Sequence, residues 1–222
     1  MEISLENLTF SYPTRVQKLI LNVPIWAVET SEVILINGPS GSGKTTLLNL
    51  LSGLLLADNG ILSVHGNRID LMSSQKRDFF RANYLGYVFQ QFNLIPYLNV
   101  IDNIRLAKYF TTKNESKNLM EEIKNLLHAL NIPIEDWSLP SRSLSFGQQQ
   151  RVAIARALIN KPRILLADEP TSSLDDANKE LFMELLMSLV EKYRITLIFV
   201  SHDYTLRKYF TRVESFSDIN II

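Results

Sequence analysis

Eight consecutive residues limit what this chain can fold into more than any other feature of its sequence. Residues 38–45 read Gly-Pro-Ser-Gly-Ser-Gly-Lys-Thr, which satisfies the pattern G-x-x-x-x-G-K-[ST] at each fixed position. The apolar run Glu32–Asn37 precedes this segment, and a helix is expected to follow it from about Lys44 to Gly53. A glycine-rich loop that leaves a buried strand and opens a helix cradles phosphate groups. The sequence therefore predicts a nucleoside triphosphate site on a parallel sheet.

The glycines of this loop let backbone N–H groups surround phosphate oxygens, where a Cβ atom would collide. Lys44 is expected to contact the β- and γ-phosphates, and the hydroxyl of Thr45 is expected to ligate Mg²⁺. A dinucleotide-binding loop would need a third glycine where Thr46 stands, so that alternative fails. The residues expected to contact the phosphates are Gly38, Pro39, Ser40, Gly41, Ser42, Gly43, Lys44, Thr45 and Thr46.

A second apolar run, Arg163–Ala167, ends in the two carboxylates Asp168 and Glu169. These residues would lie at the carboxyl edge of a parallel sheet, where ligands bind in open α/β folds. Asp168 is expected to hold Mg²⁺ directly or through its water. Glu169 is expected to accept or orient the proton of an attacking water, a role worth about 10²–10⁴ in rate. Taken alone the pair could be a solvated strand end; beside the phosphate loop the catalytic interpretation is favoured.

Composition excludes several classes of protein. The chain has 222 residues, 23 basic and 23 acidic, so no basic field favours binding to nucleic acid or to an anionic membrane. It has no cysteine, which excludes disulfides and fits a reducing compartment. The longest apolar stretch, Leu47–Ala57, falls well short of the roughly 18 residues of a membrane span. Work at a membrane would therefore require a partner.

Outside these motifs, the pattern alternates between strands and helices. Residues 1–30 read as short strands interrupted by Pro13 and Pro24, and 61–69 read as a hairpin turning at Gly66-Asn67. Residues 91–143 read as a mostly helical insertion, in which Asn118–Glu121 has the form of a capping box.

Regular α/β alternation resumes after this insertion. A helix is expected over Gln148–Asn160, and another after Asp175-Asp176. The apolar stripe expected on the second helix is Leu181, Leu185, Leu189 and Tyr193. The strand Ile195–Val200 is expected to be the last one.

Two further segments carry a resemblance to a known family. Residues 144–151 read Leu-Ser-Phe-Gly-Gln-Gln-Gln-Arg, and 168–175 read Asp-Glu-Pro-Thr-Ser-Ser-Leu-Asp. With the phosphate loop, they make the chain resemble the nucleotide-binding subunit of ATP-binding cassette (ABC) proteins over nearly its whole length. Leu144–Gln148 resembles the family's signature motif, and Ser172–Asp175 resembles its D-loop.

The resemblance implies roles for residues that would be ambiguous alone. Gln90 matches the Q-loop glutamine, expected in catalysis and as a Mg²⁺ ligand; otherwise it is an ordinary polar residue at a strand end. His202 matches the switch histidine that contacts the γ-phosphate, although a histidine after a strand is usually structural. Tyr12 matches the aromatic that stacks on adenine, or else belongs to the core. Asp175, in the segment that resembles the D-loop, is expected to contact the nucleotide.

The signature segment has both a family role and a simpler alternative. By resemblance, Ser145, Gly147 and Gln148 contact the γ-phosphate held by a second copy in a head-to-tail homodimer. From the residues alone, Ser145 and Gln148 form a capping box, an ordinary helix start that can also bind an anion. Phe146 departs from the family pattern, because the common signature has glycine there.

The fold that the resemblance implies is α/β: a P-loop NTPase (RecA-like) parallel sheet, an N-terminal antiparallel β subdomain and an inserted α-helical subdomain. Residues 1–222 would be a single domain, with the nucleotide-binding core in 1–90 and 144–222 and the helical insertion in 91–143. The cofactors would be ATP and Mg²⁺.

The resemblance is strongest to the ATPases of lipoprotein release and macrolide export, which implies an ATPase that powers a transporter through separate membrane subunits. Such a protein would be cytoplasmic and peripheral, on the inner face of the membrane. The alternative is an ABC ATPase that drives a transmembrane signalling or cell-division complex without transport. A soluble cassette acting on ribosomes or DNA is less favoured, because the chain carries one cassette and no basic patch. Phe92, Leu94, Ile95 and Tyr97 belong either to a groove for a partner's helix or to the subdomain core.

Overall fold

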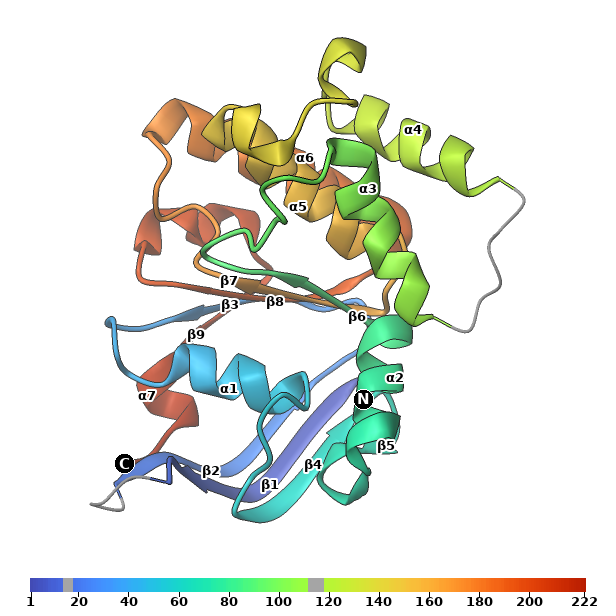
Figure 1. The fold of residues 1–222 in the computed structure, drawn as a ribbon. Coiled ribbons are helices and arrows are strands. Elements are labelled where there is room, and N and C mark those ends of the chain that lie inside the picture. Colours follow the sequence, from blue (N-terminus) through green and yellow to red (C-terminus); the bar gives the residue numbers. More distant parts are fainter. Residues whose placement is uncertain (14–17, 112–117) are drawn as a thin grey trace.

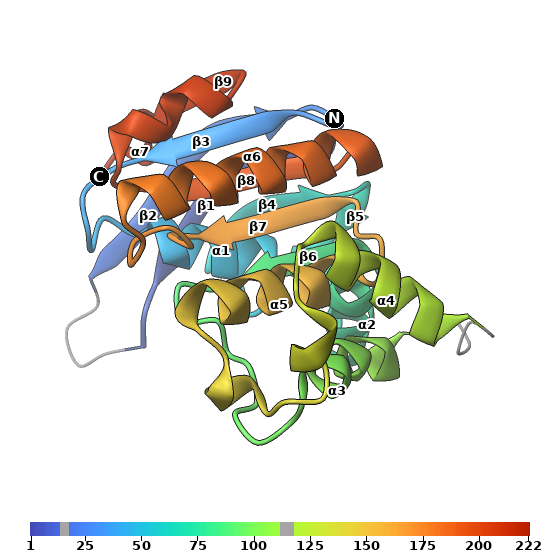
Figure 2. The same ribbon diagram turned by 90° about the horizontal axis from the view of Figure 1, so that it is seen from above.

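The computed structural model describes residues 1–13, 18–111 and 118–222. Its centre is a five-stranded parallel sheet in the order β6-β7-β8-β3-β9 (Figure 2). The strands are β3 (Val33–Asn37), β6 (Leu85–Val88), β7 (Ile164–Asp168), β8 (Thr196–Ser201) and β9 (Arg212–Ser215). Every residue of β7 and β8 is buried, as continuous apolar runs predict for a sheet covered on both faces.

A four-stranded antiparallel sheet lies below the central sheet in Figure 1, in the order β2-β1-β4-β5. Its strands are β1 (Ile3–Ser11), β2 (Leu19–Val28), β4 (Asn59–Val64) and β5 (Asn67–Arg68). The prediction that Pro24 interrupts a strand is wrong, because β2 continues through it. β2 is an edge strand, where a residue without an N–H group is tolerated.

The hairpin between β4 and β5 turns one residue earlier than predicted. Val64 pairs with Asn67, so the two turn residues are His65 and Gly66 rather than Gly66 and Asn67. Both have positive φ angles, 48° and 70°. This is the backbone that a two-residue hairpin loop of type I′ requires.

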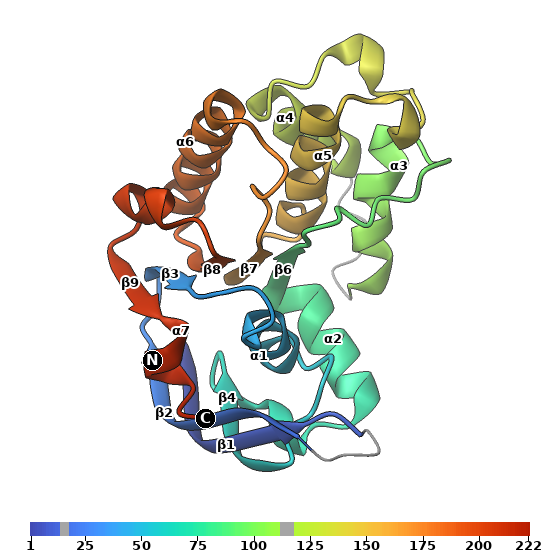
Figure 3. The same ribbon diagram turned by 90° about the vertical axis from the view of Figure 1, so that its left-hand side faces the viewer.

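Helices cover both faces of the central sheet, as Figures 1 and 3 show. The helices are α1 (Lys44–Leu51), α2 (Ser74–Tyr84), α3 (Val100–Arg105), α4 (Leu119–Ala129), α5 (Phe146–Leu158), α6 (Asp176–Tyr193) and α7 (Phe216–Ile219). Short 3₁₀ turns lie at Ile69–Leu71, Leu106–Phe110, Ile134–Asp136, Ser141–Ser143 and Tyr204–Tyr209. Helices α3 to α6 lie on one side, while α1 and α7 lie between the central sheet and the antiparallel sheet. No helix of the described ranges is long and apolar enough to cross a bilayer.

Three local expectations fail in the helical part and near the carboxyl end. α4 begins at Leu119, but the side chain of Asn118 makes no cap hydrogen bond. On α6, Leu181 is 65% exposed and Tyr193 is 39% exposed. The buried face of α6 is instead Phe182, Met183, Leu186, Leu189 and Val190. β8 is not the last strand, because β9 and α7 follow it.

Two hydrophobic cores lie on opposite sides of the central sheet. Leu165 and Ala167 of β7 face the core under α3 to α6, whereas Ile164 and Leu166 face the core that contains α1 and the antiparallel sheet. Because successive side chains of a strand point to opposite faces of the sheet, β7 contributes to both cores. Residues on one side of β7 reach the helical layer, and residues on the other side reach α1.

A single buried asparagine fixes the segment between β6 and α3. Asn103 is 0% exposed, and its Oδ1 accepts a hydrogen bond from the backbone N–H of Ile95 at 2.8 Å. Its amide nitrogen lies 3.1 Å from the carbonyl oxygen of Ile95 and 3.0 Å from that of Leu98. This side chain therefore satisfies the backbone of a segment that belongs to neither sheet nor helix.

We predict that Asn103→Ala lowers the free energy of unfolding by roughly 3 kcal/mol, because each buried backbone group left without a partner costs about 1–3 kcal/mol. Urea unfolding followed by circular dichroism measures the change. The control is Asn125→Ala on the exposed face of α4, which should stay within about 0.5 kcal/mol of wild type. Equal effects of the two substitutions would contradict the assignment.

Candidate functional site

The carboxyl ends of β3, β7 and β8 bring the predicted site residues to one edge of the sheet. Asn37 at the end of β3 pairs with Ser201 at the end of β8, and Asp168 at the end of β7 pairs with Val200. The backbone N–H of Gly38 donates to the carbonyl of Ser201 at 3.4 Å, which ties the start of the loop to this edge. The loop, the carboxylate pair and His202 therefore emerge side by side.

The loop of residues 38–43 curls around the ammonium group of Lys44. Gly41 and Gly43 have φ angles of 77° and 112°, in the left-handed region that favours glycine. Lys44 is only 4% exposed, and its Nζ donates to the carbonyl oxygens of Gly38 at 2.7 Å and Pro39 at 2.9 Å. The hydroxyl of Ser42 is buried and has no hydrogen-bond partner among the described residues. An anion inside the loop would supply that partner.

Glu169 lies between Lys44 and His202. Its Oε1 lies 3.3 Å from Lys44 Nζ, and its Oε2 lies 2.7 Å from Nδ1 of His202. The Glu169 side chain is 12% exposed, whereas that of His202 is 51% exposed. The φ angle of Glu169 is 44°, a strained backbone for a residue with a side chain. The carboxylate is thus held on both oxygens by the two groups that were predicted to act with it.

Thr45 and Asp168 supply two oxygen atoms beside the loop. The hydroxyl of Thr45 donates to Oδ1 of Asp168 at 3.1 Å. Burial raises the pKa of the Asp168 carboxyl above its ordinary 3.8; the Thr45 hydrogen bond opposes this rise, and the charge of Glu169 adds to it. A cation next to Asp168 would favour the ionised form of this carboxyl.

This pair of oxygens fits a magnesium ion that also binds nucleotide phosphates. Mg²⁺ prefers carboxylate and hydroxyl oxygens, and in such sites one or two protein ligands suffice. Within the described ranges no group of three or more His, Cys, Asp or Glu side chains could hold a metal. Such a group is not needed where phosphates and water complete the octahedron.

Tyr12 and Thr46 lie together on the side of the loop that faces the antiparallel sheet. The Tyr12 hydroxyl and the Thr46 Oγ1 share a hydrogen bond of 3.1 Å, and the Tyr12 ring meets the Phe10 ring edge-on at 4.9 Å. Tyr12 is 38% exposed. Its ring is therefore placed beside the loop with part of its surface free to stack.

Gln90 and Asp175 lie farther from the loop. Gln90 is exposed on the bend after β6, where it lines a cavity of about 610 Å³ with Phe92, Phe146 and Gln149. Asp175 caps α6 by accepting a hydrogen bond from the backbone N–H of Asn178 at 2.8 Å, and that bond holds the pKa of Asp175 below its ordinary value. The structure gives Asp175 a structural task alongside its predicted one.

Ser145 and Gln148 form the predicted capping box at the start of α5. Ser145 Oγ accepts from the Gln148 N–H at 3.3 Å, and Gln148 Oε1 accepts from the Ser145 N–H at 2.8 Å. Gln148 also donates to Asp136 at 2.5 Å. No hydrogen bond or ion pair between described residues joins this helix start to residues 38–45 of the same copy. The two anion-binding helix N-termini, those of α1 and α5, are therefore not joined by such bonds within one chain.

Two side chains that hold the site together could not be identified from the sequence. Arg156 of α5 donates to the carbonyl oxygens of Phe92 at 2.7 Å and Asn93 at 2.6 Å, just after Gln90. Gln150 of α5, 2% exposed, donates to the carbonyl of Pro170 at 2.6 Å, just after Glu169. Both act on backbone carbonyls far along the chain, which no local pattern reveals.

A glycine-rich loop around a buried lysine, an oxygen pair beside it and a carboxylate at the edge of a parallel sheet define a P-loop nucleoside triphosphatase. The particular family follows from three comparisons. A family model described as "ABC transporter" matches residues 21–172. An uncharacterized ABC transporter ATP-binding protein of Methanocaldococcus jannaschii is 40% identical over 195 residues, which cover 88% of this chain and 86% of that protein.

The lipoprotein-releasing system ATP-binding protein LolD of Treponema denticola is 35% identical over 205 residues, 92% of this chain and 90% of LolD. Among solved structures, the dimeric structure of MJ0796, a bacterial ABC transporter cassette, matches with a TM-score of 0.88 and 33% identity, covering 96% of this chain and 93% of that one. A post-hydrolysis state of the same cassette, bound to ADP and Pi, matches with the same TM-score and 32% identity.

The chain belongs to the ABC transporter family and is an ATPase subunit of that family. This confirms the resemblance drawn from residues 38–45, 144–151 and 168–175. It also confirms the predicted fold class, a P-loop NTPase sheet with an antiparallel sheet and added helices.

We predict that Asp168→Asn raises the unfolding temperature of the protein in EDTA without nucleotide. Because folding raises the pKa of Asp168, the ionised carboxylate destabilises the folded state. The free energy of unfolding therefore falls as the pH rises from 3.8 through the higher pKa of Asp168 in the folded protein. Asparagine removes the charge and keeps an acceptor for Thr45. Differential scanning calorimetry at neutral pH measures the shift. A lower unfolding temperature for the variant contradicts this account of the carboxylate.

Proposed function

We propose that this chain binds Mg²⁺·ATP, dimerises head to tail around two nucleotides and hydrolyses them to power a transporter whose membrane-spanning subunits are separate chains. The observation that carries the proposal is the position of Lys44 Nζ, between two loop carbonyls and the carboxylate of Glu169. A buried ammonium inside a glycine-rich loop at the start of a helix is suited to a triphosphate. The likeness to LolD and to the MJ0796 cassette supports the transport role.

Each residue at the sheet edge has a distinct chemical task in this proposal. Lys44 binds the β- and γ-phosphates, and Glu169 accepts or orients the proton of the attacking water. His202, 2.7 Å from Glu169, orients that carboxylate and contacts the γ-phosphate. Thr45 and Asp168 would hold magnesium, which supplies charge stabilisation to the transferring phosphoryl group.

The proposed dimer would bring together two parts of the site that are separate in one copy. Ser145, Gly147 and the first turn of α5 form an anion-binding helix start, and no hydrogen bond or ion pair among residues 1–13, 18–111 and 118–222 joins it to the loop. A second copy turned head to tail would bring this helix start to the γ-phosphate. The dimeric state of the similar MJ0796 cassette supports this arrangement. The site would then be complete only between two chains.

The remaining assignments belong to the same proposal. Tyr12 stacks on adenine, Gln90 ligates Mg²⁺ and reports the nucleotide state, and Asp175 contacts the partner copy near its nucleotide. Residues 1–90 and 144–222 act as the nucleotide-binding core, and 91–143 act as the helical insertion. The protein would be cytoplasmic and peripheral, held at the inner face of the membrane by its partners.

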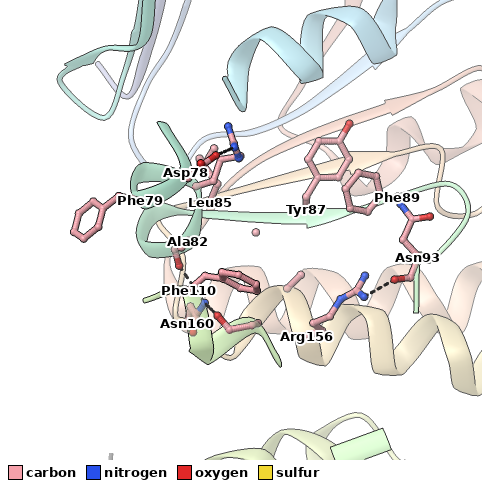
Figure 4. Close-up of a pocket in the computed structure, with 14 residues that line it drawn as sticks. Asp78, Phe79, Ala82, Leu85, Tyr87, Phe89, Asn93, Phe110, Arg156 and Asn160 are labelled. Atoms are coloured by element: carbon pink, nitrogen blue, oxygen red, sulfur yellow. Dashed lines mark hydrogen bonds and ion pairs between the residues drawn. The ribbon is translucent and has the colours of Figure 1, made fainter. Parts of the chain in front are cut away.

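A cavity of about 700 Å³ beside β6 is the proposed place for the membrane partner (Figure 4). Its wall includes Phe89 next to Gln90, Phe110 from the 3₁₀ turn after α3 and Arg156 from α5. A cytoplasmic helix of a membrane subunit would lay an apolar face against the two phenylalanines. Of the residues for which the sequence left a partner groove and the subdomain core as alternatives, Leu94 packs against the helical core and Phe92 is buried. Both also line the cavity of about 610 Å³ after β6. The alternative partner is a signalling or cell-division complex without transport.

We predict that Glu169→Gln lowers the rate of phosphate release by about 10²–10⁴-fold, because the amide cannot accept a proton. ATP binding should persist, since the substitution leaves Lys44 in place. Phosphate release measures turnover, and light scattering with ATP measures the trapped dimer. The matched control is Glu191→Gln on the exposed end of α6, which should hydrolyse ATP like wild type. Unchanged turnover in Glu169→Gln would remove Glu169 from the chemistry.

We predict that Phe110→Glu abolishes copurification with the membrane subunits while nucleotide binding is unchanged. Phe110 is 69% exposed and lines the cavity, so the substitution places a charge on the docking surface without opening the core. Tyr109→Glu is the control, because Tyr109 is equally exposed but does not line the cavity. Affinity purification from detergent-solubilised membranes compares the three proteins. Retention of the partner by Phe110→Glu, or equal loss in both variants, would contradict this docking site.

A further inference from the structure

Tyr87 of β6 lies on the same face of the central sheet as Asp168. Tyr87 pairs with Leu166 of β7, and side chains two apart on a strand share a face. Leu166 belongs to the core on the α1 side, and Tyr87 packs against that same core. The neighbouring Val88 faces the opposite core. The ring of Tyr87 is therefore on the side where Thr45, the second residue of α1, meets Asp168.

The hydroxyl of Tyr87 is buried and has no hydrogen-bond partner among the described residues. Its ring is stacked on Phe89 with centroids 4.1 Å apart and planes at 17°, so the hydroxyl is not free to turn toward another group. In Figure 4 the Tyr87 ring stands on the opposite side of β6 from Arg156 and Asn160. Tyr87 also lines the cavity of about 700 Å³ beside β6, but its hydroxyl oxygen is buried.

A buried hydroxyl without a partner costs about 1–3 kcal/mol, and phenylalanine would fill the same space without that cost. Such a group needs a partner in the working state of the protein. Asp168 lies on that face, and burial together with the negative charge of Asp168 raises the pKa of the Tyr87 phenol. Thr45 uses Oδ1 of Asp168, and Oδ2 accepts no hydrogen bond from another described residue.

We propose that Tyr87 is a positioning residue of the magnesium site, whose hydroxyl donates a hydrogen bond to Asp168 or to a water on the ion once Mg²⁺·ATP is bound. The inference rests on the proposed function, because it needs Asp168 at the metal. Groups that hydrogen-bond to metal ligands fix the orientation of the ligand, and losing one typically costs 10–100-fold in metal affinity or activity. Tyr87 would thus add a second hydrogen bond that orients Asp168, beside the one from Thr45.

The test is the thermodynamic coupling between Mg²⁺ and ATP in Tyr87→Phe. Calorimetry gives the dissociation constant of ATP in excess Mg²⁺ and in EDTA, and the ratio of the two is the coupling. We expect this ratio to fall about tenfold in Tyr87→Phe, in line with the loss of a group that orients a metal ligand. ATP binding in EDTA should be unchanged. Phenylalanine keeps the stack on Phe89, so only the oxygen is lost.

The matched control is Tyr84→Phe. Tyr84 ends α2, and its ring packs on Phe80 and His65 with centroids 5.2 and 5.1 Å away. It should keep the wild-type coupling. A second measurement is the unfolding temperature without ligands, which Tyr87→Phe should leave equal or raise, because it removes an unpartnered hydroxyl.

Three results would overturn the inference: a wild-type coupling in Tyr87→Phe, an equal loss of ATP affinity in EDTA, or a lower unfolding temperature of the unliganded variant. The last two would show that the hydroxyl serves the loop or the fold. Failure of the proposed function looks different. If wild-type protein does not bind ATP more tightly with Mg²⁺, both the function and this inference fall.

Discussion

The buried ammonium of Lys44 is the charge that the rest of the site must accommodate. An isolated charge at this depth would be strongly unfavourable, so its donors must be satisfied within a few ångströms. The carbonyls of Gly38 and Pro39 and the carboxylate of Glu169 do this. These partners come from the loop after β3 and from the end of β7. Lys44 therefore connects the carboxyl end of β3 to that of β7.

The pairing of Lys44 with Glu169 links nucleotide binding to the proposed catalytic carboxylate. In the structure, Glu169 neutralises Lys44 and is also held by His202. A triphosphate in the loop would bring several negative charges to Lys44 and make the contact with Glu169 dispensable. Glu169 would then keep only its contact with His202, which suits a group that must receive a proton. The strained φ of 44° at Glu169 is consistent with a residue placed for chemistry rather than for stability.

Local motifs were enough to predict which site residues lie together, but not the local course of the fold around them. Residues 38–45 and 168–169 lie next to the strands that position them, so short spacings were enough to predict Lys44, Thr45, Asp168 and Glu169 together. The course of β2 through Pro24 depended instead on which strand lies at a sheet edge. The buried face of α6 depended on which core it meets. Such facts are set by tertiary packing, and a single sequence does not carry them in its local pattern.

Helix α5 connects the parts of the molecule that the proposed cycle must coordinate. Its first turn holds the capping box, Gln150 holds the backbone after Glu169, and Arg156 holds the backbone after Gln90. Arg156 also lines the cavity beside β6. A rigid helix with contacts at these places cannot shift at one end without displacing the others. Because Phe146 also packs its ring on Phe92 at 4.7 Å, the residue that departs from the family signature adds a contact to this connection.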